Sequence, residues 1–185
     1  MTEQVLEDMR QEMERTVTAL RREFAHTRTG RASTALLEGI AVDYYGTRTP
    51  LNQIAGMSAP EPRLLVIQPY DKTALPQIER AILQSDLGLV PMNDGKILRV
   101  PIPELTEERR RELVKHIRKV AEDHRVSMRN HRRDALDLLK ALEKDKEITE
   151  DDLRRAQEKA QEVTKTFIDR VDQVLKVKED EIMEV

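Results

Sequence analysis

Cysteine and tryptophan are absent from the 185-residue sequence, and aromatic residues make up only 3% of it. Without cysteine the chain cannot form disulfide bonds, use thiol catalysis or bind a metal through thiolates. No apolar run approaches the ~18 residues of a membrane-spanning helix, and the acidic first ten residues lack the apolar stretch of a signal peptide. We therefore expect a soluble, cytoplasmic protein that makes no contact with membranes.

Glycine and proline are scarce and confined to one part of the chain. All six glycines and eight prolines lie between residues 30 and 103. The flanking segments contain neither residue and are rich in the good helix formers Glu, Lys, Arg, Gln and Leu. This distribution predicts an α+β fold. We expect a helical domain built from residues 1–29 and 105–185, with a turn-rich domain, 30–104, inserted between its first and second helices.

Three segments carry apolar residues at helical spacing, each on one face only. The first covers roughly the first 26 residues, the second runs from about Glu107 to Lys144, and the third follows Thr149. The second stripe comprises Leu113, Ile117, Val120, His124, Met128, His131, Ala135, Leu138 and Leu142, and the third comprises Leu153, Ala156, Ala160, Val163, Phe167, Val171, Val174 and Ile182. One-sided helices with a short 145–149 connection favour an elongated antiparallel three-helix bundle. A long two-stranded coiled coil through the second helix is the structural alternative.

The second and third helices also have start signals. Thr149 can act as an N-cap with Asp152 at the fourth position of a capping box. Thr106, followed by Glu107 and Glu108, is a similar start for the second helix.

The inserted segment has strand and turn signals instead. The predicted elements are strands at 40–45, 48–54, 64–67, 89–90 and 97–100 and a helix at 74–87. Asn93-Asp94-Gly95 between the last two strands is a strong hairpin signal. We predict a small β/α/β domain that joins the bundle through two segments of chain, near Thr29-Gly30 and Pro101–Pro103, which together allow hinge rotation.

No catalytic or cofactor-binding motif stands out. His124 and His131 share a helix face but lie seven residues apart, ~10 Å along the axis, which is too far for one metal ion. The glycines form no nucleotide-binding loop, and no nucleophile elbow is present. We expect no enzyme activity, no catalytic residue, no metal and no cofactor.

Charge is distributed unevenly along the helical part. Residues 109–133 contain ten Lys/Arg and three acidic residues, a balance of +7, whereas residues 134–185 contain ten Lys/Arg and sixteen acidic residues, a balance of −6. Four arginines each follow a residue of the second apolar stripe by one position: Arg118, Arg125, Arg129 and Arg132. Guanidinium groups bind phosphate bidentately, so these four arginines predict contact with structured RNA. Ion pairing with acidic residues of the third helix is the alternative.

Seven short motifs occur in order along the chain. They are Arg28-Thr-Gly-Arg-Ala-Ser33, Tyr44-Tyr-Gly-Thr47 with Pro50-Leu51, Ser85-Asp-Leu-Gly-Leu89, Arg99-Val-Pro-Ile-Pro103, Leu105-Thr-Glu-Glu-Arg-Arg110, Arg129-Asn-His-Arg-Arg-Asp134 and Lys144-Asp-Lys-Glu-Ile-Thr-Glu-Asp-Asp152. With these motifs the chain closely resembles the bacterial ribosome recycling factors from end to end.

The resemblance implies an L-shaped molecule whose bundle and β/α/β domain are joined by a two-stranded hinge. It also implies a translation factor that acts with elongation factor G and GTP to split the post-termination ribosome into subunits, releasing mRNA and deacylated tRNA. The GTPase belongs to elongation factor G, the bundle binds rRNA of the large ribosomal subunit, and no DNA is involved. By the resemblance and the basic segment together, the expected rRNA-binding residues are Arg132, Arg129, Arg110, Arg118, Arg125 and Arg133. The expected hinge residues are Thr29, Gly30, Arg31, Pro101, Pro103 and Glu104.

A co-chaperone or coiled-coil scaffold is the alternative from another functional class. Such proteins dimerise through a long helix, whereas three matched apolar stripes can close an internal bundle. We therefore expect a monomer of 21.4 kDa.

Overall fold

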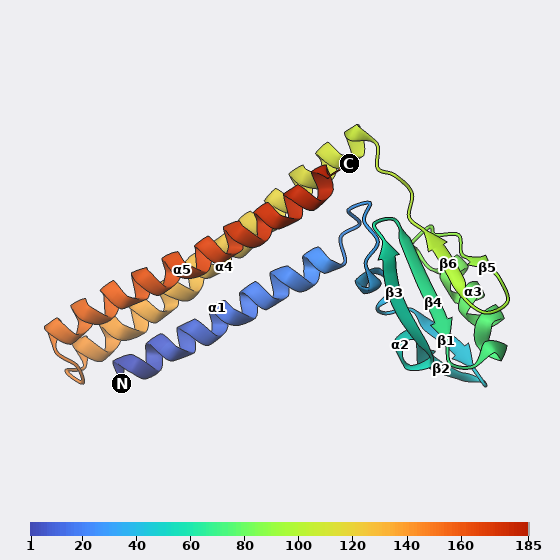
Figure 1. Ribbon diagram of the computed structural model, residues 1–185. Helices are drawn as coiled ribbons and strands as arrows, with labels where there is room; N and C mark the ends of the chain where they lie inside the picture. Colours follow the sequence, from blue (N-terminus) through green and yellow to red (C-terminus); the bar gives the residue numbers. More distant parts are fainter. Residues whose placement is uncertain (185) are drawn as a thin grey trace. The chain divides into compact units, whose positions relative to one another are not determined.

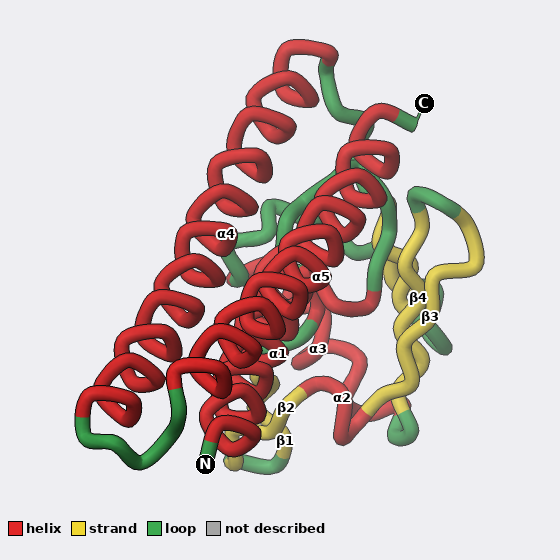
Figure 2. The backbone as a smooth tube through the Cα atoms, turned by 90° about the vertical axis from the view of Figure 1, so that its left-hand side faces the viewer, coloured by secondary structure: helices red, strands yellow, loops and turns green. Residues whose placement is uncertain are grey.

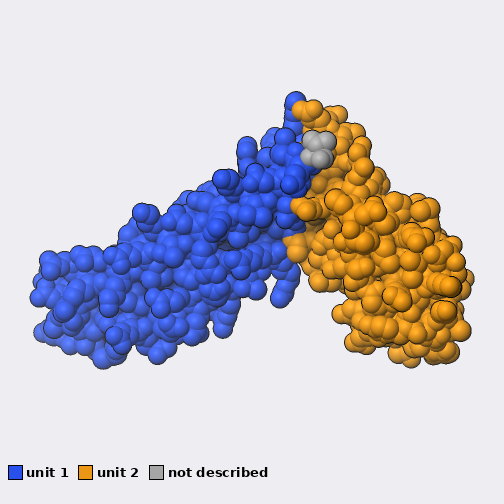
Figure 3. All heavy atoms as spheres, in the orientation of Figure 1, with its two compact units in different colours: residues 1–24, 111–185 blue, residues 25–110 orange. Residues whose placement is uncertain are grey.

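The two ends of the chain form one unit of the computed structural model, and the segment between them forms another (Figure 3). The structure describes residues 1–184. Unit 1 comprises Met1–Phe24 and Arg111–Val185, and unit 2 comprises Ala25–Arg110. The inserted unit is thus a few residues longer at each end than the predicted 30–104. On the N-terminal side, the reason is that residues following the first helix bond within unit 2. His26 lies 3.9 Å from the Glu38 carboxylate, and the Arg28 guanidinium donates to the Asp86 carbonyl.

Unit 1 is built on three long helices, α1 (Thr2–Ala25), α4 (Glu107–Lys144) and α5 (Glu150–Met183), of which the first turn of α4 belongs to unit 2. The helices run side by side, and the start of α1 lies near the connection between α4 and α5 (Figure 1). Polar contacts join every pair of helices: Glu14 with Arg170, Thr16 with His131, and Arg125 with Asp172. The antiparallel three-helix bundle is therefore confirmed over the two-stranded coiled coil.

Most residues of the predicted apolar stripes are buried in the bundle, and the others are half-buried apart from Leu138. Leu138 is 51% exposed, and the fully buried residue is its neighbour Leu139. Because both positions lie within one helical turn of the buried Ala135, periodicity alone could not choose between the two leucines. Thr164 is also buried, although it is polar, because its hydroxyl donates to the Ala160 carbonyl at 2.7 Å.

The ends of the long helices follow the predicted capping. The Thr149 hydroxyl accepts from the Asp152 backbone N–H at 3.1 Å, and the Asp152 carboxylate accepts in return from the Thr149 N–H at 3.2 Å. Thr106 accepts from the Arg109 N–H at the start of α4. The end of α4 closes through the left-handed residue Lys146 (φ 59°), with the backbone bonds of a Schellman motif.

Unit 2 contains two antiparallel sheets (Figures 1 and 2). The strands are β1 (Ala41–Tyr44), β2 (Thr47–Pro50), β3 (Ala55–Glu61), β4 (Leu64–Pro69), β5 (Met92–Asn93) and β6 (Leu98–Pro101). β1 and β2 form a hairpin, and the other four strands have the order β3-β4-β6-β5. The helical segments are η1 (Thr34–Leu37), α2 (Leu51–Ile54), η2 (Lys72–Ala74) and α3 (Leu75–Gln84). Ile78 and Ile82 of α3 are fully buried with Leu65, Ile67 and Leu98 of the larger sheet.

Two predicted strands of unit 2 needed correction, and a third strand was missed. The strand expected at 48–54 ends at Pro50, and residues 51–54 form one helical turn. Leu89-Val90 is not a strand, since β5 comprises Met92–Asn93. Strand β3 was not expected at all, because its sequence contains Gly56 and Pro60, residues that disfavour strands. Its place at the edge of the sheet makes these residues tolerable.

Candidate nucleic-acid interface

The predicted RNA-binding arginines all lie on α4. Arg118, Arg125 and Arg132 follow each other at intervals of seven residues and therefore share one face of the helix, ~10 Å apart along its axis. We call these three residues the arginine row. Arg129 lies beside the row, one turn before Arg133. The contacts made by each guanidinium divide these residues into two groups.

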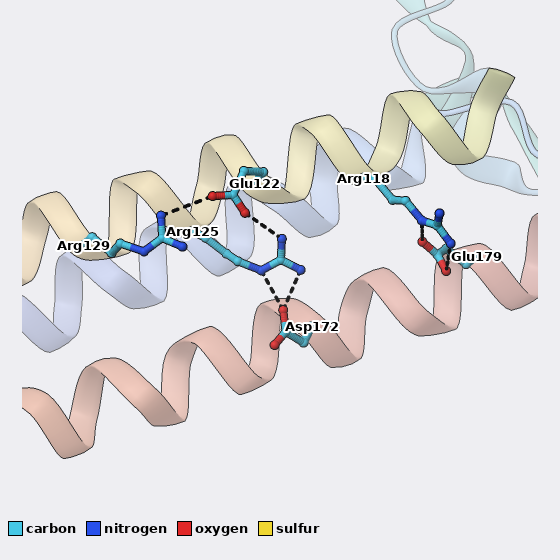
Figure 4. A network of polar contacts seen from close by, with 6 residues as sticks. All are labelled: Arg118, Glu122, Arg125, Arg129, Asp172 and Glu179. Carbon is cyan, nitrogen blue, oxygen red and sulfur yellow. Dashed lines mark hydrogen bonds and ion pairs between the residues drawn. The ribbon is translucent and has the colours of Figure 1, made fainter.

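Arg118 and Arg125 are engaged by carboxylates of α5 (Figure 4). Arg118 forms a two-pronged contact with Glu179, at 2.5 Å from Nε and 3.3 Å from Nη2. These hydrogen bonds raise the pKa of Arg118. Arg125 donates from Nε to Asp172 at 2.7 Å and pairs with the same carboxylate oxygen through Nη2 at 2.6 Å; it also donates from Nη1 to Glu122 at 3.0 Å. For these two arginines the structure agrees with the alternative interpretation of the sequence, which is ion pairing with acidic residues of the third helix.

Arg129 and Arg132 are held differently, each by a single Nη1 atom. Arg129 donates to Glu122 at 3.2 Å, and Arg132 donates to the side-chain oxygen of Gln161 on α5 at 2.8 Å. Among residues 1–184, no hydrogen bond or ion pair engages the Nε–Nη2 edge of either guanidinium. This edge is one that can grip a phosphate through two parallel hydrogen bonds.

Glu122 links the two groups of arginines. Its carboxylate accepts from Arg125 with one oxygen and from Arg129 with the other, so that a chain of contacts runs Asp172–Arg125–Glu122–Arg129 (Figure 4). The hydrogen bond from Arg125, followed by that from Arg129, lowers the pKa of Glu122. Two carboxylates balance two guanidiniums in this chain, whereas the Arg132–Gln161 pair keeps a full positive charge.

The other two predicted arginines lie at either end of the basic segment. Arg133 is exposed and has no polar partner in the part of the chain that the structure describes. Arg110 is half-buried in the first turn of α4, where its backbone N–H donates to the Thr106 carbonyl at 3.0 Å.

The predicted hinge residues all lie in unit 2, where both connecting segments are tied to the β3–β4 turn. The Ala32 N–H donates to the Pro62 carbonyl at 2.6 Å, and the Ile102 N–H donates to the adjacent Arg63 carbonyl at 2.8 Å. The Arg63 guanidinium also forms an ion pair with Glu104 at 2.6 Å. The predicted residues have varied settings: Thr29 is buried, Gly30 has a φ of +76°, Arg31 is exposed, Pro101 ends β6, and Pro103 and Glu104 follow as exposed residues.

Unit 2 carries a groove of about 1200 Å³ between the β1–β2 hairpin and α3. Tyr45 lines this groove, is 78% exposed and adopts a φ of 49°, a left-handed conformation that is rare for a bulky residue. Its hydroxyl donates to Asp71 at 3.0 Å, and its ring meets Tyr44 edge-on at 4.5 Å. Tyr45 was not predicted as a site residue: the sequence placed it at the end of the strand expected at 40–45, whereas the structure places it in the turn that follows β1.

Two kinds of site are not found in residues 1–184. No group of three or more His, Asp or Glu side chains is arranged to hold a metal ion. None of the helices there is both long and apolar enough to span a membrane.

Comparison with known proteins places these features in one family. The family model described as "Ribosome recycling factor" matches residues 20–183. The ribosome-recycling factors of Carboxydothermus hydrogenoformans and Geobacillus kaustophilus are 55% and 54% identical to this chain, with both chains covered completely. A solution structure of a ribosome recycling factor aligns with a TM-score of 0.79 at 42% identity, covering 100% of this chain and 98% of the other.

A second solved structure is described as models of the T. thermophilus ribosome recycling factor and the E. coli elongation factor G bound to the E. coli post-termination complex. It aligns with a TM-score of 0.70 at 46% identity and covers both chains completely. The chain therefore belongs to the ribosome recycling factor family.

Proposed function

We propose that this protein acts with elongation factor G and GTP to split the post-termination ribosome into subunits, freeing mRNA and deacylated tRNA for a new round of initiation. The observation that carries the proposal is the likeness, over the whole chain, to a recycling factor placed with elongation factor G on a post-termination complex. The open guanidinium edges of Arg129 and Arg132 support it independently, because they suit RNA phosphates.

In this proposal the bundle is the ribosome-binding part. Its helix α4 has 38 residues and is therefore about 57 Å long, and cross-helix contacts stiffen it. Arg132 is the main contact with phosphates of large-subunit rRNA in this proposal. Arg129 and Arg133 lie near it, whereas Arg110 lies ~33 Å away, at the other end of the basic segment. We expect Arg118 and Arg125 to contribute less to RNA binding than the sequence suggested, because α5 carboxylates already occupy them.

Unit 2 and the two connecting segments form the moving part of the proposed mechanism. Both segments are anchored to neighbouring carbonyls of one turn, so rotation would pivot where they leave that turn. Elongation factor G would contact unit 2, and the exposed Tyr45 at its groove offers an aromatic surface for such a contact. The chain itself would act as a monomer and catalyse no reaction, since GTP is bound and hydrolysed by elongation factor G.

Light scattering on stalled post-termination ribosomes tests this function. A drop in scattering that requires this protein, elongation factor G and GTP together is the expected result. Arg132→Ala should slow splitting at limiting protein concentration, whereas Arg154→Ala is a matched control, because Arg154 is an exposed arginine of α5 with only a 3.9 Å ion pair to Asp151. The absence of both splitting and ribosome binding would overturn the proposal.

A further inference from the structure

We propose that Gln161 is a positioning residue for ribosome binding: it fixes the guanidinium of Arg132 against α5 without neutralising it. The inference rests on the proposed function, since it assumes that Arg132 meets RNA phosphate. It assigns a role to a residue of α5, the helix that carries more acidic residues than either of the other two helices of the bundle.

The first observation is a break in a regular pairing pattern. The arginine row on α4 has a spacing of seven residues, and the carboxylates that engage its first two members, Glu179 and Asp172, are also seven residues apart on the antiparallel helix α5. Another step of seven leads to Lys165, which cannot accept a hydrogen bond. The third pair in this series therefore lacks a carboxylate, and Arg132 reaches Gln161 instead.

The second observation is the chemistry of the contact that replaces the ion pair. The amide oxygen of Gln161 accepts one hydrogen bond from Nη1 of Arg132, at 2.8 Å, and carries no charge. One such bond restricts the rotation of a long side chain, which reduces the entropy lost when RNA binds. The charge of Arg132 is left uncompensated, because no ion pair to it exists among residues 1–184.

A carboxylate at position 161 would have the opposite effect. As Glu179 does with Arg118, it could occupy the fork of the guanidinium and compete directly with phosphate. Glutamine at position 161 therefore orients the guanidinium of Arg132 and leaves its positive charge intact. Its side chain is exposed at the edge of the bundle, so changing it does not disturb the core.

The test measures binding to isolated large ribosomal subunits over a range of KCl concentrations. Gln161→Glu should weaken binding about tenfold and reduce the slope of log K against log[KCl] by about one, because one phosphate contact is lost. Gln161→Ala should weaken binding only about twofold to fivefold and leave the slope unchanged, because the charge stays but its orientation is lost. Gln173→Glu is the matched control, since it adds the same charge to an exposed position of α5 and should bind like the wild type.

A double variant separates positioning from general repulsion. In an Arg132→Ala background, Gln161→Glu should have no further effect on affinity or slope. Circular dichroism verifies that each variant keeps its helix content. If Gln161→Glu unfolds, the affinity of Gln161→Ala alone tests whether Gln161 positions Arg132. If the wild type binds and the Gln161 variants bind with the same affinity and the same salt slope, the inference is overturned while the proposed function stays intact. Failure of the wild type to bind would overturn both.

Discussion

Lys146 is a residue whose backbone conformation suits another amino acid. It occupies the left-handed position that ends α4, where glycine is the common choice. We predict that Lys146→Gly raises the free energy of unfolding by about 0.5–1 kcal/mol, because it relieves steric strain at this position. Urea unfolding measures the change. Lys140→Gly, in the exposed interior of the same helix, should instead destabilise the protein by about 1 kcal/mol. A loss of stability in Lys146→Gly would contradict the prediction.

Gly30 combines a left-handed backbone with a crowded environment. Its φ is +76°, and a Cβ atom added there would lie 2.9 Å from Cγ of Leu105. We expect Gly30→Ala to destabilise unit 2 by about 2–3 kcal/mol, whereas Gly39→Ala, at φ +85° with nothing within 4 Å of the added Cβ, should cost only about 1 kcal/mol. Adding Leu105→Ala to Gly30→Ala should recover the difference. Equal losses of stability in the two glycine variants would show that the contact with Leu105 does not add to the cost of a side chain at position 30.

Proline at position 30 is a poor probe of hinge motion, because its φ near −65° is incompatible with this backbone.

At the scale of elements, the pairing of α1 with α5 should make stability depend on pH. Arg170 donates to both oxygens of Glu14, at 2.7 and 2.8 Å, and its guanidinium lies 4.9 Å from the centre of the Phe167 ring. The hydrogen bond from Arg170 is the main cause that lowers the pKa of Glu14. A lowered carboxyl pKa stabilises the folded state above the ordinary glutamate range, and this contribution is lost as the pH falls through the folded-state pKa.

We therefore predict that Glu14→Gln makes the thermal midpoint less sensitive to pH below about 4.5. At pH 7 the same substitution should reduce stability by at most about 1 kcal/mol, since Glu14 is half exposed and its ion pair is screened by solvent. Differential scanning calorimetry between pH 3 and 7 compares the two proteins. Glu12→Gln, which changes an exposed carboxylate of the same helix without touching Arg170, is the control. Identical pH profiles for the wild type and Glu14→Gln would contradict this account.

Helix positions were predictable because their signals are local. The bounds of α4 and the capping box of Thr149 with Asp152 follow from spacing and from short-range hydrogen bonds. The choice between Leu138 and Leu139 depends on where the other two helices lie, and strand β3 depends on its partner β4. Neither is contained in a local pattern.

The candidate site shows the same division between local features, which the sequence predicts, and long-range contacts, which it does not. The sequence indicated which arginines share a face of α4, but two of those arginines bind Glu179 and Asp172, which lie 61 and 47 residues further along the chain. Gln161 could not be singled out from the sequence, because its meaning depends on the register between two antiparallel helices. That register is fixed by core packing rather than by any motif.

For the whole molecule, residues of α4 should separate into those that serve binding and those that serve stability. Arg132 has a neutral partner and an open edge, Arg129 shares the carboxylate of Glu122, and Arg125 is only 20% exposed and bound to two carboxylates. Removing Arg125 leaves Asp172 and Glu122 without this partner. The free energy of folding should therefore respond most to Arg125, and the affinity for the ribosome most to Arg132.

We predict that Arg132→Ala weakens binding to the large subunit about tenfold, Arg129→Ala by less, and Arg125→Ala by less than about twofold. In urea unfolding the order should reverse, with Arg125→Ala losing about 1–2 kcal/mol and Arg132→Ala less than about 0.5 kcal/mol. Both measurements should be made on the same preparations at a fixed salt concentration, because phosphate contacts weaken as salt rises. Equal binding losses for Arg125→Ala and Arg132→Ala, with unchanged stability in both, would mean that the α5 carboxylates release Arg125 to the RNA. The division of α4 into binding and structural arginines would then be wrong. Asp172 and Glu122 would pair with Arg125 only in the free protein, and RNA phosphates would replace them on binding.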